Sequence, residues 1–178
     1  IAIRALTFVK ALFFFCCETG RNKIMEKWDR ILHASNVLMD LKAQRNFDAI
    51  RELASVLTDD GIVPDQKRFL ADLIQREQQA STGIGKGVAV PHTHEDTIDR
   101  QLLAIGISQE GVDFASPDGA PVHIVALLAT PRKHQKLHME LLAALSRLLQ
   151  HEDVRESLIN AADSAEVVEI FTQKRQLG

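Results

Sequence analysis

The segment Ser81-Thr82-Gly83-Ile84-Gly85-Lys86-Gly87-Val88-Ala89-Val90-Pro91-His92 carries the sharpest change of pattern in this chain. Its glycine-rich half follows a helical pattern and leads into a short apolar run, which Pro91 stops. A short run of this kind, bounded by residues that break regular structure, is typical of a strand. His92 therefore follows a strand end, where α/β proteins tend to place their functional sites.

Two helical patterns precede this segment. The first begins at Asn46, which can serve as an N-cap, and ends before Gly61 and Pro64. Asp65 can cap the second helix, and Arg76 lies near the C-terminal end of that helix. Both patterns have apolar residues at three- and four-residue spacing, which predicts helices packed against a core.

Two strands and three helices are predicted after the segment. The strands cover residues 102 to 107 and 122 to 128, and the second is almost continuously apolar, as in a strand covered on both faces. The helices cover residues 133 to 150, 153 to 162 and 164 to 173. Helices before, between and after strands predict an α/β fold with a sheet flanked by helices on both faces.

The composition of the 178 residues limits the function. A hydrophobic content of 46% is enough for one ordinary domain. The net charge of -3 argues against nucleic acid or an anionic membrane as the main partner. Cys16 and Cys17 are adjacent and form no disulfide framework, which favours a cytoplasmic protein.

The first 24 residues differ in character from the rest. Their apolar run, residues 11 to 17, is much shorter than the ~20 residues needed to span a bilayer. No small-residue cleavage site follows the run, so we do not expect a signal peptide. We interpret residues 1–24 as a linker, disordered segment or sequence upstream of a start at Met25, and residues 25–178 as the domain.

The glycines at positions 83, 85 and 87 suggest a phosphate-binding loop but fit neither common nucleotide motif. A P-loop requires Lys followed by Ser or Thr, and the dinucleotide fingerprint follows a strand and opens a helix, the reverse of the order here. Two interpretations stay open. Gly83 and Gly85 can simply permit tight turns, or they can form a small anion site with Ser81 and Thr82 as hydroxyl donors.

Three further side chains each have a structural and a functional interpretation. His92 can be a structural histidine or a reactive one. His138 borders the buried face of a helix, so it can bond a backbone carbonyl or point into the same pocket as His92. Arg76 can interact with the helix dipole and solvent, or bind a phosphate with its planar fork of donors.

Two pairs of histidines suggest a metal site as an alternative. His92 with His94, and His134 with His138, have spacings that suit zinc ligands. No cysteine contributes, and His134 is expected to face solvent, so we predict no metal. A serine or cysteine nucleophile has less support, because Ser81 lacks the strand-to-helix context that a nucleophile elbow requires.

The residues Arg76-Glu77, followed by the segment from Ser81 to His92, resemble the enzyme IIA domain of the bacterial phosphoenolpyruvate-dependent phosphotransferase system, type 2 (the fructose, mannitol and nitrogen-regulatory branch). The resemblance continues through Phe114, Asp118-Gly119-x-Pro121-Val122 and His138-x-x-Leu141-Leu142-x-x-Leu145, and covers roughly residues 29 to 173. It implies a mixed sheet between two helical layers.

The resemblance also implies the roles of the site residues. His92 is the expected phosphoryl acceptor, His138 the second pocket histidine and Arg76 the cation that stabilises the phosphate. Neither metal nor nucleotide is required in the transfer. A neutral imidazole is a competent nucleophile near neutral pH, which agrees with these roles. Further candidates for the phosphate pocket are Ser81, Thr82, Gly83 and Gly85.

The partners implied are an HPr-like phosphocarrier as donor and a IIB domain as acceptor in sugar uptake. The alternative is a regulatory, nitrogen-type IIA module that acts through phosphorylation-dependent protein binding. The chain departs from many relatives after the Pro-His pair, where Thr93 and His94 replace a glycine and often a basic residue. This departure affects the inference about the partner protein and the sugar more than the inference that His92 accepts the phosphoryl group.

Overall fold

The structure is a computed structural model that describes residues 28–58, 61 and 63–174. In this part of the chain the sheet contains β1 Val37–Leu38, β2 Gly83–Gly85, β3 Val88–Ala89, β4 His92–Glu95, β5 Leu102–Val112 and β6 Val122–Pro131. The helices are α2 Trp28–Ile31, α3 Asn46–Thr58, α4 Gln66–Gln79, α5 Gln135–Gln150, α6 Glu152–Ile159 and α7 Ser164–Gln173. Residues 1–24 lie outside the described part.

The sheet is mixed, as predicted. Its strand order is β1-β5-β6-β3-β2, with β4 also paired to β6. Strand β6 runs antiparallel to β5 and parallel to both β3 and β4, while β1 is parallel to β5 and β2 is antiparallel to β3. The central position of β6 explains its continuous run of buried residues.

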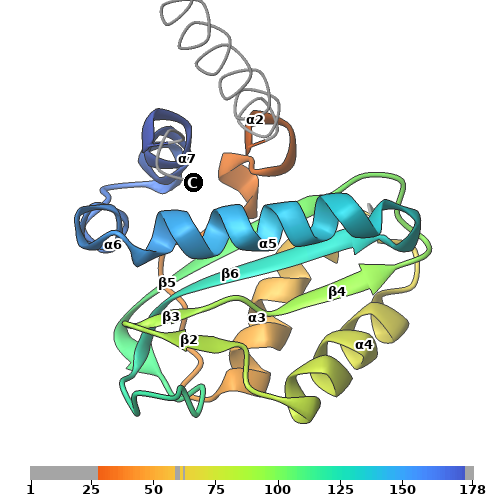
Figure 1. The fold of residues 1–178 in the computed structure, drawn as a ribbon, viewed down its shortest axis with the longest axis horizontal. Helices are drawn as coiled ribbons and strands as arrows, with labels where there is room; N and C mark the ends of the chain where they lie inside the picture. Colours follow the sequence, from red (N-terminus) through yellow and green to blue (C-terminus); the bar gives the residue numbers. More distant parts are fainter. Residues whose placement is uncertain (1–27, 59–60, 62, 175–178) are drawn as a thin grey trace, which may run out of the picture.

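Helices cover both faces of the sheet (Figure 1). Helices α3 and α4 lie on one face, and α5, α6 and α7 lie on the other. Alternation along β6 divides the core: Ile124, Ala126 and Leu128 belong to the cluster under α5, whereas Val125, Leu127 and Ala129 pack with α3. The predicted three-layer arrangement is confirmed.

The ends of the helices follow local hydrogen bonding. Asp65 caps α4 as predicted, with its side chain accepting from the Arg68 N–H. Helix α5 begins two residues later than predicted because a short 3-10 turn, Arg132–His134, comes first. Helix α6 stops at Ile159 instead of 162, where the backbone and side-chain N–H groups of Asn160 both bond the Glu156 carbonyl.

The glycine-rich segment forms a structural turn. Gly83–Gly85 is a strand, which sequence analysis missed, and Gly85, Lys86 and Gly87 all have positive φ. The Lys86 N–H donates to the Asp118 carboxylate at 2.7 Å, and backbone N–H groups hold the pKa of Asp118 below its usual value. The turn therefore binds a carboxylate of the protein itself.

Strand β4 was not predicted. The predicted strand does end before Pro91, as β3, but the chain then forms β4, in line with β3 along the same edge of β6. Pro91 has no N–H, yet its carbonyl accepts from the Leu128 N–H, so pairing with β6 continues past it. His92 and His94 consequently share one face of β4.

None of the helices in the described part of the chain is long and apolar enough to cross a membrane.

Candidate functional site

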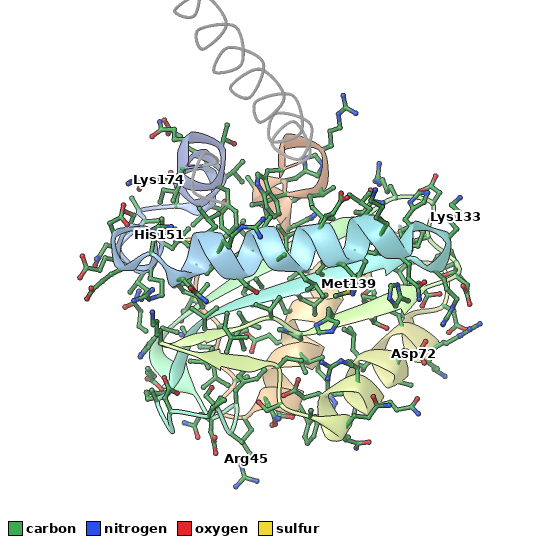
Figure 2. All side chains as sticks on the ribbon, in the orientation of Figure 1. Arg45, Asp72, Lys133, Met139, His151 and Lys174 are labelled. Carbon is green, nitrogen blue, oxygen red and sulfur yellow. The ribbon has the colours of Figure 1, made fainter. Side chains whose placement is uncertain are left out.

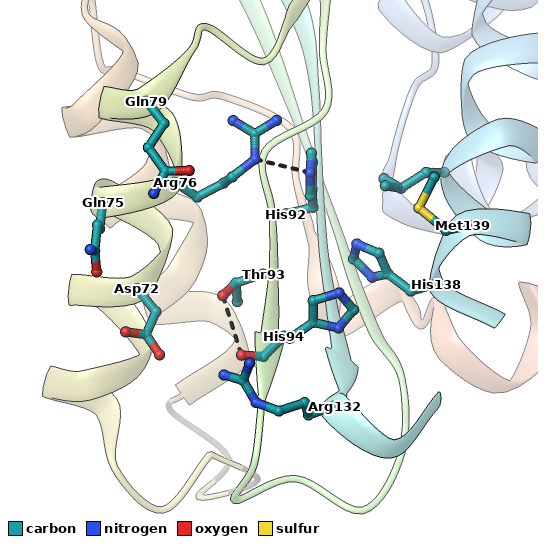
Figure 3. Close-up of a pocket in the computed structure, with 11 residues that line it drawn as sticks. Asp72, Gln75, Arg76, Gln79, His92, Thr93, His94, Arg132, His138 and Met139 are labelled. Atoms are coloured by element: carbon teal, nitrogen blue, oxygen red, sulfur yellow. Dashed lines mark hydrogen bonds between the residues drawn. The ribbon is translucent and has the colours of Figure 1, made fainter. Parts of the chain in front are cut away.

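A cavity of about 530 Å³ opens beside β4, between α4 and α5 (Figure 3). The structure brings together three of the predicted residues there, each from a different element: Arg76 from α4, His92 from β4 and His138 from α5. In the close-up, Arg76 and His138 approach His92 from opposite sides. The other lining residues are Asp72, Gln75, Gln79, Thr93, His94, Arg132, Met139 and Leu142.

The hydrogen bonds of His92 determine which of its nitrogens can react. Its Nδ1 lies 2.8 Å from the Val90 carbonyl oxygen. Because a carbonyl can only accept, the proton of the neutral ring is on Nδ1, which leaves the lone pair on Nε2. Burial lowers the pKa of His92, the Val90 carbonyl opposes this shift, and the charge of Arg76 adds to it. His92 is therefore neutral at pH 7, with its nucleophilic nitrogen at Nε2.

Arg76 contacts this nucleophilic nitrogen directly. Its Nε–H donates to His92 Nε2 at 3.2 Å, and its Nη1 donates to the Ala80 carbonyl at 3.0 Å. These two bonds hold the guanidinium beside the ring. A cation in this place can bind an anionic group attached to Nε2.

The neighbouring Glu77 anchors the end of α4. It is 4% exposed, and its carboxylate accepts the hydroxyl of Thr82 at 2.6 Å as well as the Thr82 N–H. A buried charge with several hydrogen bonds is well satisfied and resists displacement. Glu77 thus joins the last turn of α4 to the chain that enters β2, which supports the placement of Arg76.

His138 is the second pocket histidine that the family resemblance implied. It is 2% exposed, and its ring centroid lies 5.4 Å from that of His92. Burial, followed by the electrostatic influence of His94 and His92, lowers the pKa of His138 to about 4. Its imidazole is therefore neutral at physiological pH and can donate one hydrogen bond and accept another.

His94 and Arg132 are among the lining residues that were not assigned to the site from the sequence. His94 was considered only as a metal ligand and as a departure from relatives, but its ring centroid lies 4.1 Å from that of His138. The two-residue spacing from His92 on a strand was the signal for it. Arg132 lines the cavity from the turn before α5, and its Nε donates to Asp96 at 3.0 Å. No local sequence pattern marks Arg132.

The four remaining pocket candidates lie elsewhere. The Ser81 hydroxyl donates to the Phe114 carbonyl, and the Thr82 hydroxyl donates to Glu77. None of these four residues lines the cavity: Ser81, Thr82, Gly83 and Gly85. Their predicted role in phosphate binding therefore has no support from a contact in the structure.

The four histidines of the zinc hypothesis do not assemble. His134 is partly buried, contrary to the expectation that it faces solvent, and its Nδ1 pairs with the Gln101 amide at 2.9 Å outside the cavity. Within residues 28–58, 61 and 63–174, no group of three or more His, Cys, Asp or Glu side chains is arranged to hold a metal ion.

Comparison with known proteins identifies the family. Residues 30–174 match the family described as "Phosphoenolpyruvate-dependent sugar phosphotransferase system, EIIA 2". The chain belongs to this family. It is accordingly a IIA domain of the phosphotransferase system, and its activity is that of a phosphoryl-carrier phosphotransferase domain.

Similar proteins come from both the sugar and the regulatory branches. The fructose-specific EIIA component of Haloferax volcanii is 35% identical over 125 residues, covering 70% of the IIA domain chain and 81% of the relative. The fructose-specific EIIABC component of Bacillus subtilis is 31% identical over 147 residues, which is 83% of this chain but 23% of that protein. The chain thus spans about a quarter of the Bacillus relative.

A solved structure supports the same assignment. The nitrogen regulatory protein IIA-Ntr from Neisseria meningitidis superposes with a TM-score of 0.75 at 29% identity. The match covers 80% of this chain and 97% of the Neisseria chain. The described fold of the IIA domain is therefore shared over nearly the whole of a regulatory relative.

We expect the stability of the IIA domain to fall in mild acid because of His138. The pKa of His138 is lowered from 6.5 to about 4, so the unfolded chain takes up a proton between these values before the folded chain does. The stabilisation is complete above pH 6.5 and is lost as the pH falls through 4. Its size is on the order of 2 kcal/mol, because solvent at the cavity mouth weakens part of the effect.

Urea unfolding between pH 7 and 4 measures this dependence. The His138→Gln variant, which cannot be protonated, should lose less stability over the range than the wild-type protein. His33→Gln, at an exposed position, serves as the control and should behave as wild type. Equal pH dependence in wild type and His138→Gln would contradict the assignment.

Proposed function

We propose that the IIA domain, formed by residues 25–178 in the cytoplasm, accepts a phosphoryl group on His92 Nε2 from an HPr-like phosphocarrier and passes it to a IIB domain in sugar uptake. The observation that carries the proposal is the 2.8 Å contact between His92 Nδ1 and the Val90 carbonyl, because it leaves the Nε2 lone pair at the cavity. The transfer uses no cofactor.

The reaction moves one phosphoryl group between two nitrogens. The Nε2 lone pair attacks the phosphorus of a phosphohistidine on the donor, the donor's N–P bond breaks, and its electron pair returns to the donor ring. The new N–P bond places positive charge on the His92 ring, and the Nδ1–H bond to the Val90 carbonyl stabilises that charge. The second transfer, to the acceptor, reverses these roles.

The surrounding residues position the group and balance its charge. Phosphoryl transfer has charge spread over the phosphoryl oxygens, so a nearby cation lowers its barrier. Before the reaction, the Nε–H of Arg76 is hydrogen-bonded to His92 Nε2. A small movement of the guanidinium then lets it bond the oxygens of the incoming phosphoryl group. Neutral His138, on the opposite side of His92, can donate a hydrogen bond to them.

Incubation with phosphorylated donor protein tests the proposal. We expect one phosphoryl group per chain, acid-labile and base-stable, at His92, and ³¹P NMR should report attachment at Nε2 rather than Nδ1. Phosphorylated HPr and its nitrogen-branch counterpart should both be supplied as donors. Absence of phosphorylation of folded protein by either donor would exclude the carrier function, and attachment at Nδ1 would exclude the assigned tautomer.

A second candidate function is regulation by phosphorylation-dependent protein binding. It is favoured by the similarity to IIA-Ntr of Neisseria meningitidis, which extends over 97% of that chain. His92→Asp adds a negative charge at the acceptor position and His92→Gln does not, so a regulated partner should discriminate between them. If affinity screens with both variants find no such partner, the regulatory candidate fails while the carrier function stands.

A further inference from the structure

His94 has no role in the transfer as described so far, although it lies in the cavity. We propose that His94 is a positioning residue: its ring packs against His138 and holds that imidazole in the orientation that meets the phosphoryl group on His92. The inference rests on the proposed function. It rests also on three properties of the described site, namely hydrogen bonding, ring packing and charge.

The first property is the lack of a hydrogen-bond anchor for His138. His92 is fixed by the Val90 carbonyl at its Nδ1, but the Nδ1 of His138 is buried without a partner in the described structure. A histidine that serves a reaction normally has its second nitrogen held by a carbonyl or carboxylate. The ring of His138 therefore depends on packing for its orientation.

The second property is the packing itself. The rings of His94 and His138 have centroids 4.1 Å apart and are tilted by 42°, whereas His92 is farther from His138, at 5.4 Å. In the close-up His94 lies next to His138, on the side toward Arg132 (Figure 3). Two rings packed this closely leave each other little room to rotate.

The sheet reinforces the contact. His94 pairs with Thr130 of β6, so both side chains lie on the face of the sheet that α5 covers. Thr130 Oγ1, like the Nδ1 atoms of His94 and His138, is buried without a hydrogen-bond partner in the described structure. Each such atom has lost its hydrogen bonds to water without gaining others, which lowers the stability of the fold. Buried polar atoms without partners are typical of a functional site, where side chains are held in position for the reaction at a cost in folding stability.

The third property is charge. Burial and the neighbouring Arg132 lower the pKa of His94, so two neutral rings face each other at physiological pH. Asp96 opposes this shift, but its carboxylate is bound to the Arg132 guanidinium. A neutral His94 can stack on His138 without electrostatic repulsion. Charged or titratable groups surround the pair on three elements. His92 lies on β4 and Asp96 directly follows it, Arg132 precedes α5, and Asp72 and Arg76 lie on α4.

Three substitutions at position 94 distinguish the effect of the aromatic ring from the effects of side-chain bulk and polarity. His94→Phe keeps an aromatic ring, His94→Leu removes it at similar bulk, and His94→Gln keeps polarity and length without a ring. Under single-turnover conditions with phosphorylated donor, we expect Leu and Gln to slow transfer on the order of tenfold and Phe to stay within about threefold of wild type. The donor concentration for half-maximal rate should not change, because the proposal assigns His94 to the orientation of His138 and not to donor docking.

A second measurement does not require phosphoryl transfer. Carbon-13 relaxation of the His138 ring in unphosphorylated protein should show a rigid ring in wild type and His94→Phe and a mobile ring in His94→Leu and His94→Gln. His151→Gln, an exposed substitution at the end of α5, is the matched control and should be silent in both experiments. The Gln variant carries the test if the Leu variant does not fold.

The outcomes separate the two proposals. A wild-type protein that takes no phosphoryl group refutes the proposed function, and the relaxation data then decide the positioning role alone. Wild-type transfer together with a normal rate in both ringless variants overturns the role of His94. A His94→Phe protein as slow as His94→Leu overturns it as well, because the ring would then not be the feature that matters.

Discussion

The His92→Gln variant is expected to take up no phosphoryl group from a phosphorylated donor, a loss of at least about a thousandfold in rate. Glutamine fills similar space and can hydrogen-bond to Arg76, but its amide nitrogen has no available lone pair. The partly exposed position at the start of β4 should tolerate the change. Phosphate incorporation measured by intact-protein mass spectrometry at neutral pH, with circular dichroism to verify folding, provides the measurement.

The matched control for this variant is His151→Gln, which removes an exposed histidine at the C-terminal end of α5, outside the cavity lining (Figure 2). It should incorporate phosphate like wild type. Phosphorylation of His92→Gln at another pocket histidine would show that His92 is not the sole acceptor in the cavity. Full wild-type incorporation in that variant would refute the assignment of His92 altogether.

Substitution of Arg76 should produce the second-largest effect. Arg76→Gln removes the charge beside Nε2, and we expect transfer to slow by roughly 10²–10³-fold, as for other lost donors to a developing anion. Arg76→Lys keeps the charge but loses the planar fork that bonds both His92 and Ala80. Its transfer rate should therefore lie between those of the wild-type protein and Arg76→Gln. Rapid-quench measurement of a single transfer reports the chemical step.

Arg51→Gln is the control for charge alone. Arg51 is an exposed residue of α3 paired with Asp48, and its loss should leave the transfer rate unchanged. If Arg76→Gln transfers as fast as Arg51→Gln, the contact with Nε2 is not part of the mechanism. A rate for Arg76→Lys equal to that of Arg76→Gln would instead assign the whole effect to the guanidinium geometry.

Local pattern accounts for most of the regular structure. Asp65 and Asp163 are short side chains that cap the helices after them by bonding a backbone N–H three residues on, an interaction encoded entirely in local sequence. The apolar run of β6 likewise requires cover on both faces wherever it is placed. Element ends were less predictable, as at α6, because competing hydrogen bonds such as those of Asn160 end the helix.

The glycine-rich segment shows why similar residues can serve different purposes. Glycines that permit positive φ suit an anion cradle and a tight turn equally well. Whether the segment binds an external anion or forms a turn depends on which acceptor lies opposite the Lys86 N–H. That acceptor is Asp118, 32 residues along the chain. Local sequence contains no information about this partner. The Ser81 hydroxyl likewise has a distant acceptor, the Phe114 carbonyl 33 residues along the chain, whereas the Thr82 hydroxyl donates to Glu77, five residues before it.

The candidate site divides in the same way. The residue types at positions 76, 92 and 138, and the family motif around them, predict an acceptor histidine, a second histidine and a cation. Their meeting in one cavity and the depressed pKa of His138 depend on contacts between α4, β4 and α5, whereas the tautomer of His92 follows from the Val90 carbonyl two residues before it. His94 and Arg132 joined the site only through pairing of β4 with β6 and the turn before α5. Sequence specifies which groups are available locally, whereas distance, burial and charge between groups arise only once distant segments pack together.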